Sequence, residues 1–367
     1  MTVTRSPIAR LVEYGQSPWN DNLTRGLITG GGLQRLIDED GIRGVTSNPT
    51  IFEKAMASGE GYDDQLAQVA RSGAPIETTY WALVLDDIRH AADVLRPTYD
   101  ELDGTDGFVS VEVAPDRANE TAATIEQVHW LHGQAARPNV FVKIPATIEG
   151  IPAIEQCLAE GISINITLIF SLVRYAEIIE AYFRGLERHA EQGGDVSRVA
   201  SVASFFVSRV DTEADRRLPE DHPLRGKVAV ANAKLAYQLF RERFTGDRWA
   251  ALEARGARFQ RPLWASTSTK NPAYSDTLYV DELVGRDTVN TLAQPSIEAL
   301  RDHGDPQPDT ITRDVEGAQR VVDDLAGAGI AYDDLTDTIE REGVDSFERS
   351  YRDCLASLEK HAAELTS

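Results

Sequence analysis

Short apolar runs alternate with longer amphipathic stretches along this chain. In the run at 139–147, β-branched residues occupy every second position, Phe141 and Lys143 share the opposite face, and Pro145 closes the run. A run of this length and composition predicts a strand that is buried on both faces, as in parallel sheets. Lys143 is the one charged residue within it.

Seven further runs have the same character, and a stretch with helical spacing follows each of them. The eight runs are 16–21, 44–49, 108–113, 139–147, 161–170, 199–207, 262–268 and 288–293. Eight strands that alternate with helices predict a TIM (β/α)₈ barrel. In the run at 161–170, Ser163, Asn165 and Thr167 are expected on one face, with Ile164, Ile166 and Leu168 on the other.

From about residue 300 the pattern becomes purely helical and acidic, with helices expected over 311–325, 332–342 and 345–365. We interpret 300–367 as an appended C-terminal helical layer of a single domain that spans 1–367. The chain shows no solenoid-length repeat and no obvious linker.

Polar residues stand at or near the ends of the predicted strands. They are Asp21, Asn48, Glu112, Lys143, Asn165, Ser204 and Ser266. The active sites of such barrels lie at the C-terminal ends of the strands, which predicts that these side chains converge. The alternative is an internal hydrogen-bond network without chemistry, because buried polar groups must be satisfied.

Lys143 is the candidate nucleophile. An apolar wall disfavours the ammonium form, and the neutral amine attacks ketones to form a Schiff base. The alternative is a lysine that extends to solvent from the strand end or pairs with a carboxylate. The polar residues around it favour chemistry.

The composition narrows the classes of partner. A net charge of −22 disfavours nucleic acid and anionic membranes, so an anionic substrate needs local cationic contacts. The two cysteines, Cys157 and Cys354, lack metal-site spacing and suit a reducing compartment. No bilayer-length apolar stretch and no apolar leader is present, so we expect a cytoplasmic protein.

Four ordered segments resemble those of transaldolases of the pentose phosphate pathway, and the likeness runs almost end to end. They are GVTSNP at 44–49, VFVKIPA at 140–146, INITLIF at 164–170 and LWASTSTKNP at 263–272. The resemblance implies transfer of a dihydroxyacetone unit from sedoheptulose 7-phosphate to glyceraldehyde 3-phosphate, giving erythrose 4-phosphate and fructose 6-phosphate. It implies no cofactor, no metal, and a monomer or homodimer.

The resemblance also implies a role for individual residues. Lys143 forms the Schiff base, Asp21 takes the donor hydroxyl proton during carbon–carbon cleavage, and Glu112 acts through a water in carbinolamine dehydration and hydrolysis. The substrate-binding residues it implies are Asn48, Thr46, Asn165, Thr167, Ser204, Phe206, Arg209, Ser266 and Lys270.

The phosphate site departs from the family pattern. Arg209 and Ser266 match phosphate-binding positions, but many members place a second arginine two residues after the serine, where this chain has Ser268. Lys270 is assigned that phosphate role, although a lysine lacks the bidentate fork of arginine. The alternative for Lys270 is a structural role in the loop. The alternative for Arg209 is an ion pair with Asp211 or Glu213.

Asp21 also has an alternative role, as the N-cap of a helix.

The alternative functions are those of a related aldolase, a metal-dependent lyase and a barrel used only for binding. An aldolase of the same superfamily would release the three-carbon unit, but such enzymes are shorter and tend to carry Gln in place of Glu112 and Tyr in place of Phe206. A metal-dependent lyase would need converging ligands, and none of the seven histidines ends a predicted strand. A barrel used only for binding would not need Lys143, Asp21 and Glu112 together.

Overall fold

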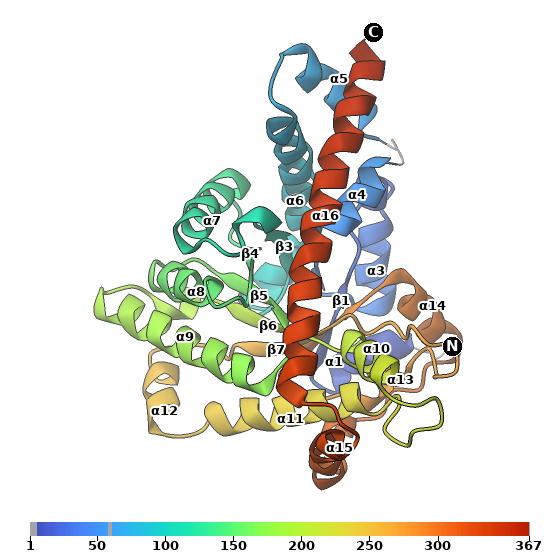
Figure 1. Ribbon diagram of the computed structural model, residues 1–367. Helices are drawn as coiled ribbons and strands as arrows, with labels where there is room; N and C mark the ends of the chain where they lie inside the picture. Colours follow the sequence, from blue (N-terminus) through green and yellow to red (C-terminus); the bar gives the residue numbers. More distant parts are fainter. Residues whose placement is uncertain (1–5, 58–60, 367) are drawn as a thin grey trace, which may run out of the picture.

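The computed structural model, which describes residues 6–57 and 61–366, contains a closed barrel of parallel strands in the order β1 to β8 (Figure 1). The predicted TIM barrel is therefore confirmed, with a strand at each of the eight expected runs. The strands are β1 Gln16–Asn20, β2 Gly44–Val45, β3 Phe108–Glu112, β4 Val140–Pro145, β5 Ile164–Ile169, β6 Ser201–Phe206, β7 Arg261–Ala265 and β8 Thr288–Leu292.

Helices surround the strands and cover their outer apolar faces (Figure 1). They are α1 Pro7–Glu13, α2 Arg25–Thr29, α3 Gly32–Asp40, α4 Pro49–Ala57, α5 Asp63–Arg71, α6 Ile76–Glu101, α7 Thr121–Ala135, α8 Gly150–Ala159, α9 Leu172–Glu191, α10 Ser208–Arg217, α11 Val228–Arg243, α12 Asp247–Glu253, α13 Leu278–Glu282, α14 Gln294–His303, α15 Val315–Gly327 and α16 Tyr332–Thr366. Short 3₁₀ turns occur at Pro115–Arg117, Val196–Arg198 and Thr310–Thr312.

Aromatic side chains fill the barrel below the predicted site. The rings of Phe108 and Phe141 stack with centroids 4.1 Å apart, and Trp19 lies 6.2 Å from Phe141. Gly44 lies against this cluster, because a Cβ at that position would stand 2.4 Å from the Trp19 ring. Lys143, two positions further along β4 than Phe141, therefore lies directly above this layer of packed aromatic rings, which we call the aromatic floor.

Two details of the strands differ from the expectation. β2 is only two residues long, because after Val45 the chain leaves the sheet. In β5 the pairing with β6 shifts between Ile166 and Ile169, and Leu168 adopts a left-handed conformation with φ 58°. The expected alternation therefore ends at Thr167, since a bulge breaks the two-residue period.

The C-terminal segment forms one helix where two were expected. α16 is continuous over 35 residues and packs against α4, α5, α6 and α10. Figure 1 shows it, in red, running past the barrel from α15 to the level of α5. Hydrogen bonds fix it laterally, with Thr50 Oγ1 2.8 Å from Ser350 Oγ and His361 2.8 Å from Asp63.

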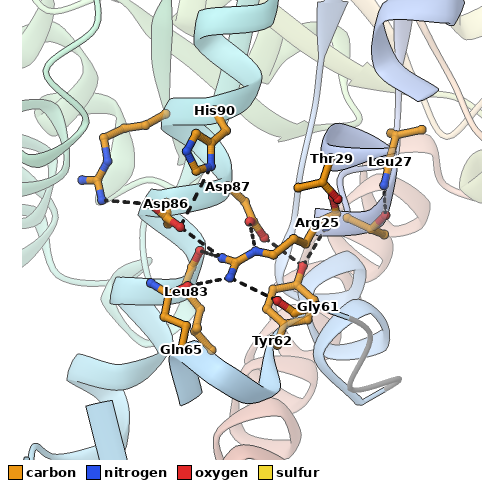
Figure 2. A network of polar contacts seen from close by, with 12 residues as sticks. Arg25, Leu27, Thr29, Gly61, Tyr62, Gln65, Leu83, Asp86, Asp87 and His90 are labelled. Carbon is orange, nitrogen blue, oxygen red and sulfur yellow. Dashed lines mark hydrogen bonds and ion pairs between the residues drawn. The ribbon is translucent and has the colours of Figure 1, made fainter. Parts of the chain in front are cut away.

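A buried polar network anchors the segment that follows β1 (Figure 2). The Arg25 Nε donates to Asp87 Oδ1 at 2.7 Å, and its Nη1 donates to Gln65 at 2.6 Å. The Tyr62 hydroxyl donates to the second Asp87 oxygen at 2.8 Å, and its ring lies under the guanidinium. These contacts join α2 to α5 and α6, and so hold the chain just after Asp21.

Within the described ranges, no helix combines the length and apolarity needed to span a bilayer. Cys157 and Cys354 are both buried free thiols.

Candidate active site

Lys143 and Glu112 form a buried ion pair inside the barrel. They are opposite partners on β4 and β3, and their side chains are only 5% and 3% exposed. The Lys143 Nζ lies 3.0 Å from Glu112 Oε2 and donates to the Ser47 carbonyl, also at 3.0 Å. Burial raises the pKa of Glu112, an effect that the adjacent lysine opposes.

Asp21 lies at the end of β1, where β8 fixes its backbone. Its N–H donates to the Leu292 carbonyl at 2.8 Å, and its Oδ1 accepts from the Thr46 hydroxyl at 2.7 Å. Burial raises the pKa of Asp21, and the Thr46 bond partly offsets that effect. Thr24, rather than Asp21, caps α2, so the alternative role as an N-cap is wrong.

A chain of buried hydrogen bonds links three strands beside the lysine. The Ser204 hydroxyl donates to Asn165 Oδ1 at 2.7 Å, and Asn165 Nδ2 donates to Ser110 Oγ at 3.0 Å. Asn165 is fully buried and therefore orients Ser204. Thr167 is equally buried, and its hydroxyl has no hydrogen-bond partner among the described residues.

A cavity of about 280 Å³ opens above these groups. Every predicted site residue lines it except Glu112, which lies behind Lys143, and Asn165, which lies behind Ser204. Asn48 reaches it from the start of α4, where its Oδ1 accepts from the Ile51 N–H at 3.0 Å.

Cationic side chains occupy one part of the cavity wall. The Arg209 guanidinium lies 5.5 Å from the centre of the Phe206 ring, and burial lowers the pKa of this arginine. Burial also lowers the pKa of Lys270, with a further contribution from nearby Arg209. No carboxylate of the described residues forms an ion pair with Arg209. Asp211 accepts hydrogen bonds from Ala229 and Tyr279 instead.

Glu213, the other expected alternative partner of Arg209, pairs with Arg216 and Arg217. Ser266 has a left-handed backbone with φ 55°, and its hydroxyl lies 2.8 Å from that of Ser208. Strained backbone of this kind gathers at functional sites.

The family profile of "Transaldolase/Fructose-6-phosphate aldolase" matches residues 18–358. The chain belongs to this family. It is 52% identical over 356 residues to a transaldolase of Acidothermus cellulolyticus, with 96% of each chain covered. It is 48% identical to transaldolase 2 of Streptomyces coelicolor and to a transaldolase of Mycobacterium tuberculosis, with 98% of each chain covered in both comparisons.

These relatives confirm the transaldolase activity expected from the sequence. The alignments cover almost the full length of both this chain and these relatives. At the level of sequence, the length of the chain favours a transaldolase over the shorter aldolases.

The lining of the transaldolase cavity includes residues that were not anticipated, and Lys54, Phe347 and Thr291 are three of them. Lys54 projects from α4, Phe347 from α16 and Thr291 from β8. Thr291 bonds to Thr46 at 2.6 Å, and its polar side chain within the last predicted strand was a usable signal. Lys54 and Phe347 lie in helical stretches where a lysine normally faces solvent and a phenylalanine normally packs in the core, so the pattern gave no signal.

None of the described histidines lines this cavity. The described part of the chain also holds no group of three or more His, Cys, Asp or Glu side chains arranged to bind a metal.

Proposed function

We propose that Lys143, Asp21 and Glu112 carry the transfer of a dihydroxyacetone unit from sedoheptulose 7-phosphate to glyceraldehyde 3-phosphate. The observation that supports this most strongly is the position of the Lys143 amine. It lies buried beside Glu112, on the wall of a cavity that also holds Asp21 and several cations. The products are erythrose 4-phosphate and fructose 6-phosphate.

The first step forms the Schiff base. The ion pair is the resting state, and the raised pKa of Glu112 makes its carboxylate a readier acceptor for the ammonium proton. The neutral Lys143 amine attacks the ketose carbonyl to give a carbinolamine. Loss of water, with Glu112 acting through a bound water, then gives the iminium.

The second step breaks the carbon–carbon bond. Asp21 takes the proton of the donor hydroxyl, the electron pair of the C3–C4 bond moves into the iminium, and the aldose phosphate leaves. A three-carbon enamine remains on Lys143. Its attack on the acceptor aldehyde returns the proton from Asp21, and hydrolysis frees the amine and the product. The iminium serves as the electron sink, so these steps call for no metal or organic cofactor.

The remaining residues hold the substrate. Asn48, Thr167 and Ser204 bind its hydroxyl groups, with Asn165 and Thr46 as orienting partners and Phe206 as an apolar wall. Arg209, Ser266 and Lys270 bind the phosphate, and Lys54 adds a further positive charge. This local cluster counteracts a net charge of −22, which would otherwise repel an anionic sugar.

We further propose that the protein acts in the cytoplasm as a monomer or homodimer. The buried free thiols of Cys157 and Cys354 suit a reducing compartment. Residues 300–367 are proposed to belong to the same single domain as the barrel, because α16 supplies a wall of the cavity.

A comparison of transfer with release tests the proposed reaction. With sedoheptulose 7-phosphate alone, dihydroxyacetone should appear far more slowly than erythrose 4-phosphate appears when glyceraldehyde 3-phosphate is added. Rapid release of dihydroxyacetone without an acceptor would contradict the proposal and favour a fructose-6-phosphate aldolase-like lyase.

A further inference from the structure

The Arg209 guanidinium is held between two aromatic rings from distant parts of the chain. Its central carbon lies 5.5 Å from the centre of Phe206, at the end of β6, and 5.7 Å from that of Phe347, on α16. Phe347 is only 5% exposed and lines the catalytic cavity. Both separations are within the range of cation–π attraction.

This arrangement leaves the charge of Arg209 available. A largely buried arginine is usually paired with a carboxylate, which would compete with a phosphate for its N–H groups. Within the described residues Arg209 has no such ion pair, and Glu112 and Glu342 influence it only at longer range. The two rings hold the guanidinium without using its hydrogen-bond donors.

A second direction is open to the same side chain. Arg209 also lines a groove of about 520 Å³, shared with Glu213 and Glu342. An arginine released from the inner cavity could turn toward these carboxylates. The Phe347 ring contacts the guanidinium and lines the inner cavity but not this groove, so the contact favours the inward position.

The backbone of α16 also lies close to Arg209, at Gly343. A methyl group at Gly343 would stand 3.3 Å from Arg209 Nη1 and 3.1 Å from Leu168 Cδ2. The bond between Ser350 and Thr50 fixes this part of α16 to α4. A side chain at Gly343 would therefore displace Leu168 or the Arg209 guanidinium by a few tenths of an ångström.

We infer that Phe347 is a positioning residue, through which the C-terminal helix orients Arg209 for the phosphate of the sugar substrate. The inference rests on the proposed function, since it takes Arg209 as a phosphate ligand. It assigns α16 a part in substrate selection, because Phe347 should matter for phosphorylated sugars and not for their unphosphorylated counterparts.

Phe347→Leu tests the inference, because leucine retains apolar bulk but lacks the π face. The KM for fructose 6-phosphate should rise about tenfold, with little change in kcat. The kcat/KM for unphosphorylated fructose should stay the same. Phe347→Tyr, which keeps the ring, should restore the KM for the phosphorylated donor.

Phe183→Leu is a matched control. Phe183 is also buried and contacts an arginine, with its ring centre 5.2 Å from Arg248, but it lies outside the cavity. This variant should leave both KM values unchanged. An equal loss with both donors in Phe347→Leu, or no change with either, would overturn the inference.

Gly343→Ala provides a second test should Phe347→Leu fold poorly, since alanine favours the helix. Its methyl group should crowd Arg209 and raise the KM for fructose 6-phosphate alone.

Trapping of unphosphorylated dihydroxyacetone on Lys143 with borohydride distinguishes a failure of the role of Phe347 from a failure of the proposed function. If wild type forms the adduct but neither variant alters the phosphate dependence, only the role of Phe347 fails. If wild type forms no adduct, the proposed function itself fails.

Discussion

Lys143 and Glu112 face each other across adjacent strands, with Nζ 3.0 Å from Oε2. The pairing follows from the strand register, because both side chains point into the barrel at the same height. Below them is the aromatic floor, and above them is the substrate cavity. The amine that must become a nucleophile thus rests beside a group able to accept its proton.

Replacing Glu112 by Gln should slow Schiff-base formation. The amide keeps the size of the side chain but can neither accept the ammonium proton nor activate a water. The rate of iminium formation, measured by rapid quenching with borohydride, should fall about 100-fold. An unchanged rate in a folded variant would show that Glu112 has no part in proton transfer.

Thr46→Val should change the pH dependence of the reaction. The Thr46 hydroxyl stabilises the carboxylate of Asp21, so its removal should raise the pKa of Asp21 further above its ordinary value. Asp21 acts as a base only when deprotonated, and the base form is lost as the pH falls through this pKa. The acidic limb of kcat/KM should therefore move upward by about one pH unit, while the alkaline limb stays in place. A downward shift would contradict the assignment of Asp21 as the base.

Removing the cavity lysines should weaken phosphate binding. Lys270→Gln and Lys54→Gln should each raise the KM for sedoheptulose 7-phosphate by about tenfold, because a charge-assisted contact is lost. Added salt should reduce the difference from wild type for both lysines, because both side chains are exposed. Lys360→Gln is the control, since Lys360 is exposed on α16 and does not line the cavity. An equal effect in the control would point to the overall charge instead.

Asp211→Asn should alter the pH dependence of stability. Burial raises the pKa of Asp211 from 3.8 to about 6, so the folded state favours the protonated form. The stabilisation from this group is complete below the unfolded pKa and is lost as the pH rises to about 6.

The asparagine variant does not titrate at this position. Wild type should therefore lose stability relative to the variant as the pH rises from about 4 to about 6.5. The free energy of unfolding of the variant minus that of wild type should increase over this range. Two pKa units set an upper limit of about 3 kcal/mol on this change. Urea unfolding across the range measures it, and a difference that does not vary with pH would contradict the prediction.

The barrel and most of its site were predictable because parallel strands give strong local signals. The run around Lys143 is buried on both faces, so its apolar residues and the proline at its end are visible in the sequence. Residues at the strand ends, such as Asp21 and Ser204, converge wherever a barrel closes. Local pattern and global topology agree at these positions.

The remaining features depend on contacts between distant parts of the chain. Phe347 reaches the cavity only because α16 continues as one helix across α4, and helical spacing does not reveal where a helix docks. The position of Lys54 in the cavity likewise depends on where α4 docks, which its helical spacing does not reveal. The alternating pattern did not predict the bulge at Leu168, because a leucine with a left-handed backbone has no sequence signature.

Borohydride trapping of the enzyme with fructose 6-phosphate, followed by peptide mass spectrometry, tests the central claim most directly. A single reduced three-carbon adduct is expected on Lys143 of the wild-type protein. It should be absent from a folded Lys143→Ala variant. An adduct on another lysine, or one that persists in that variant, would contradict the account.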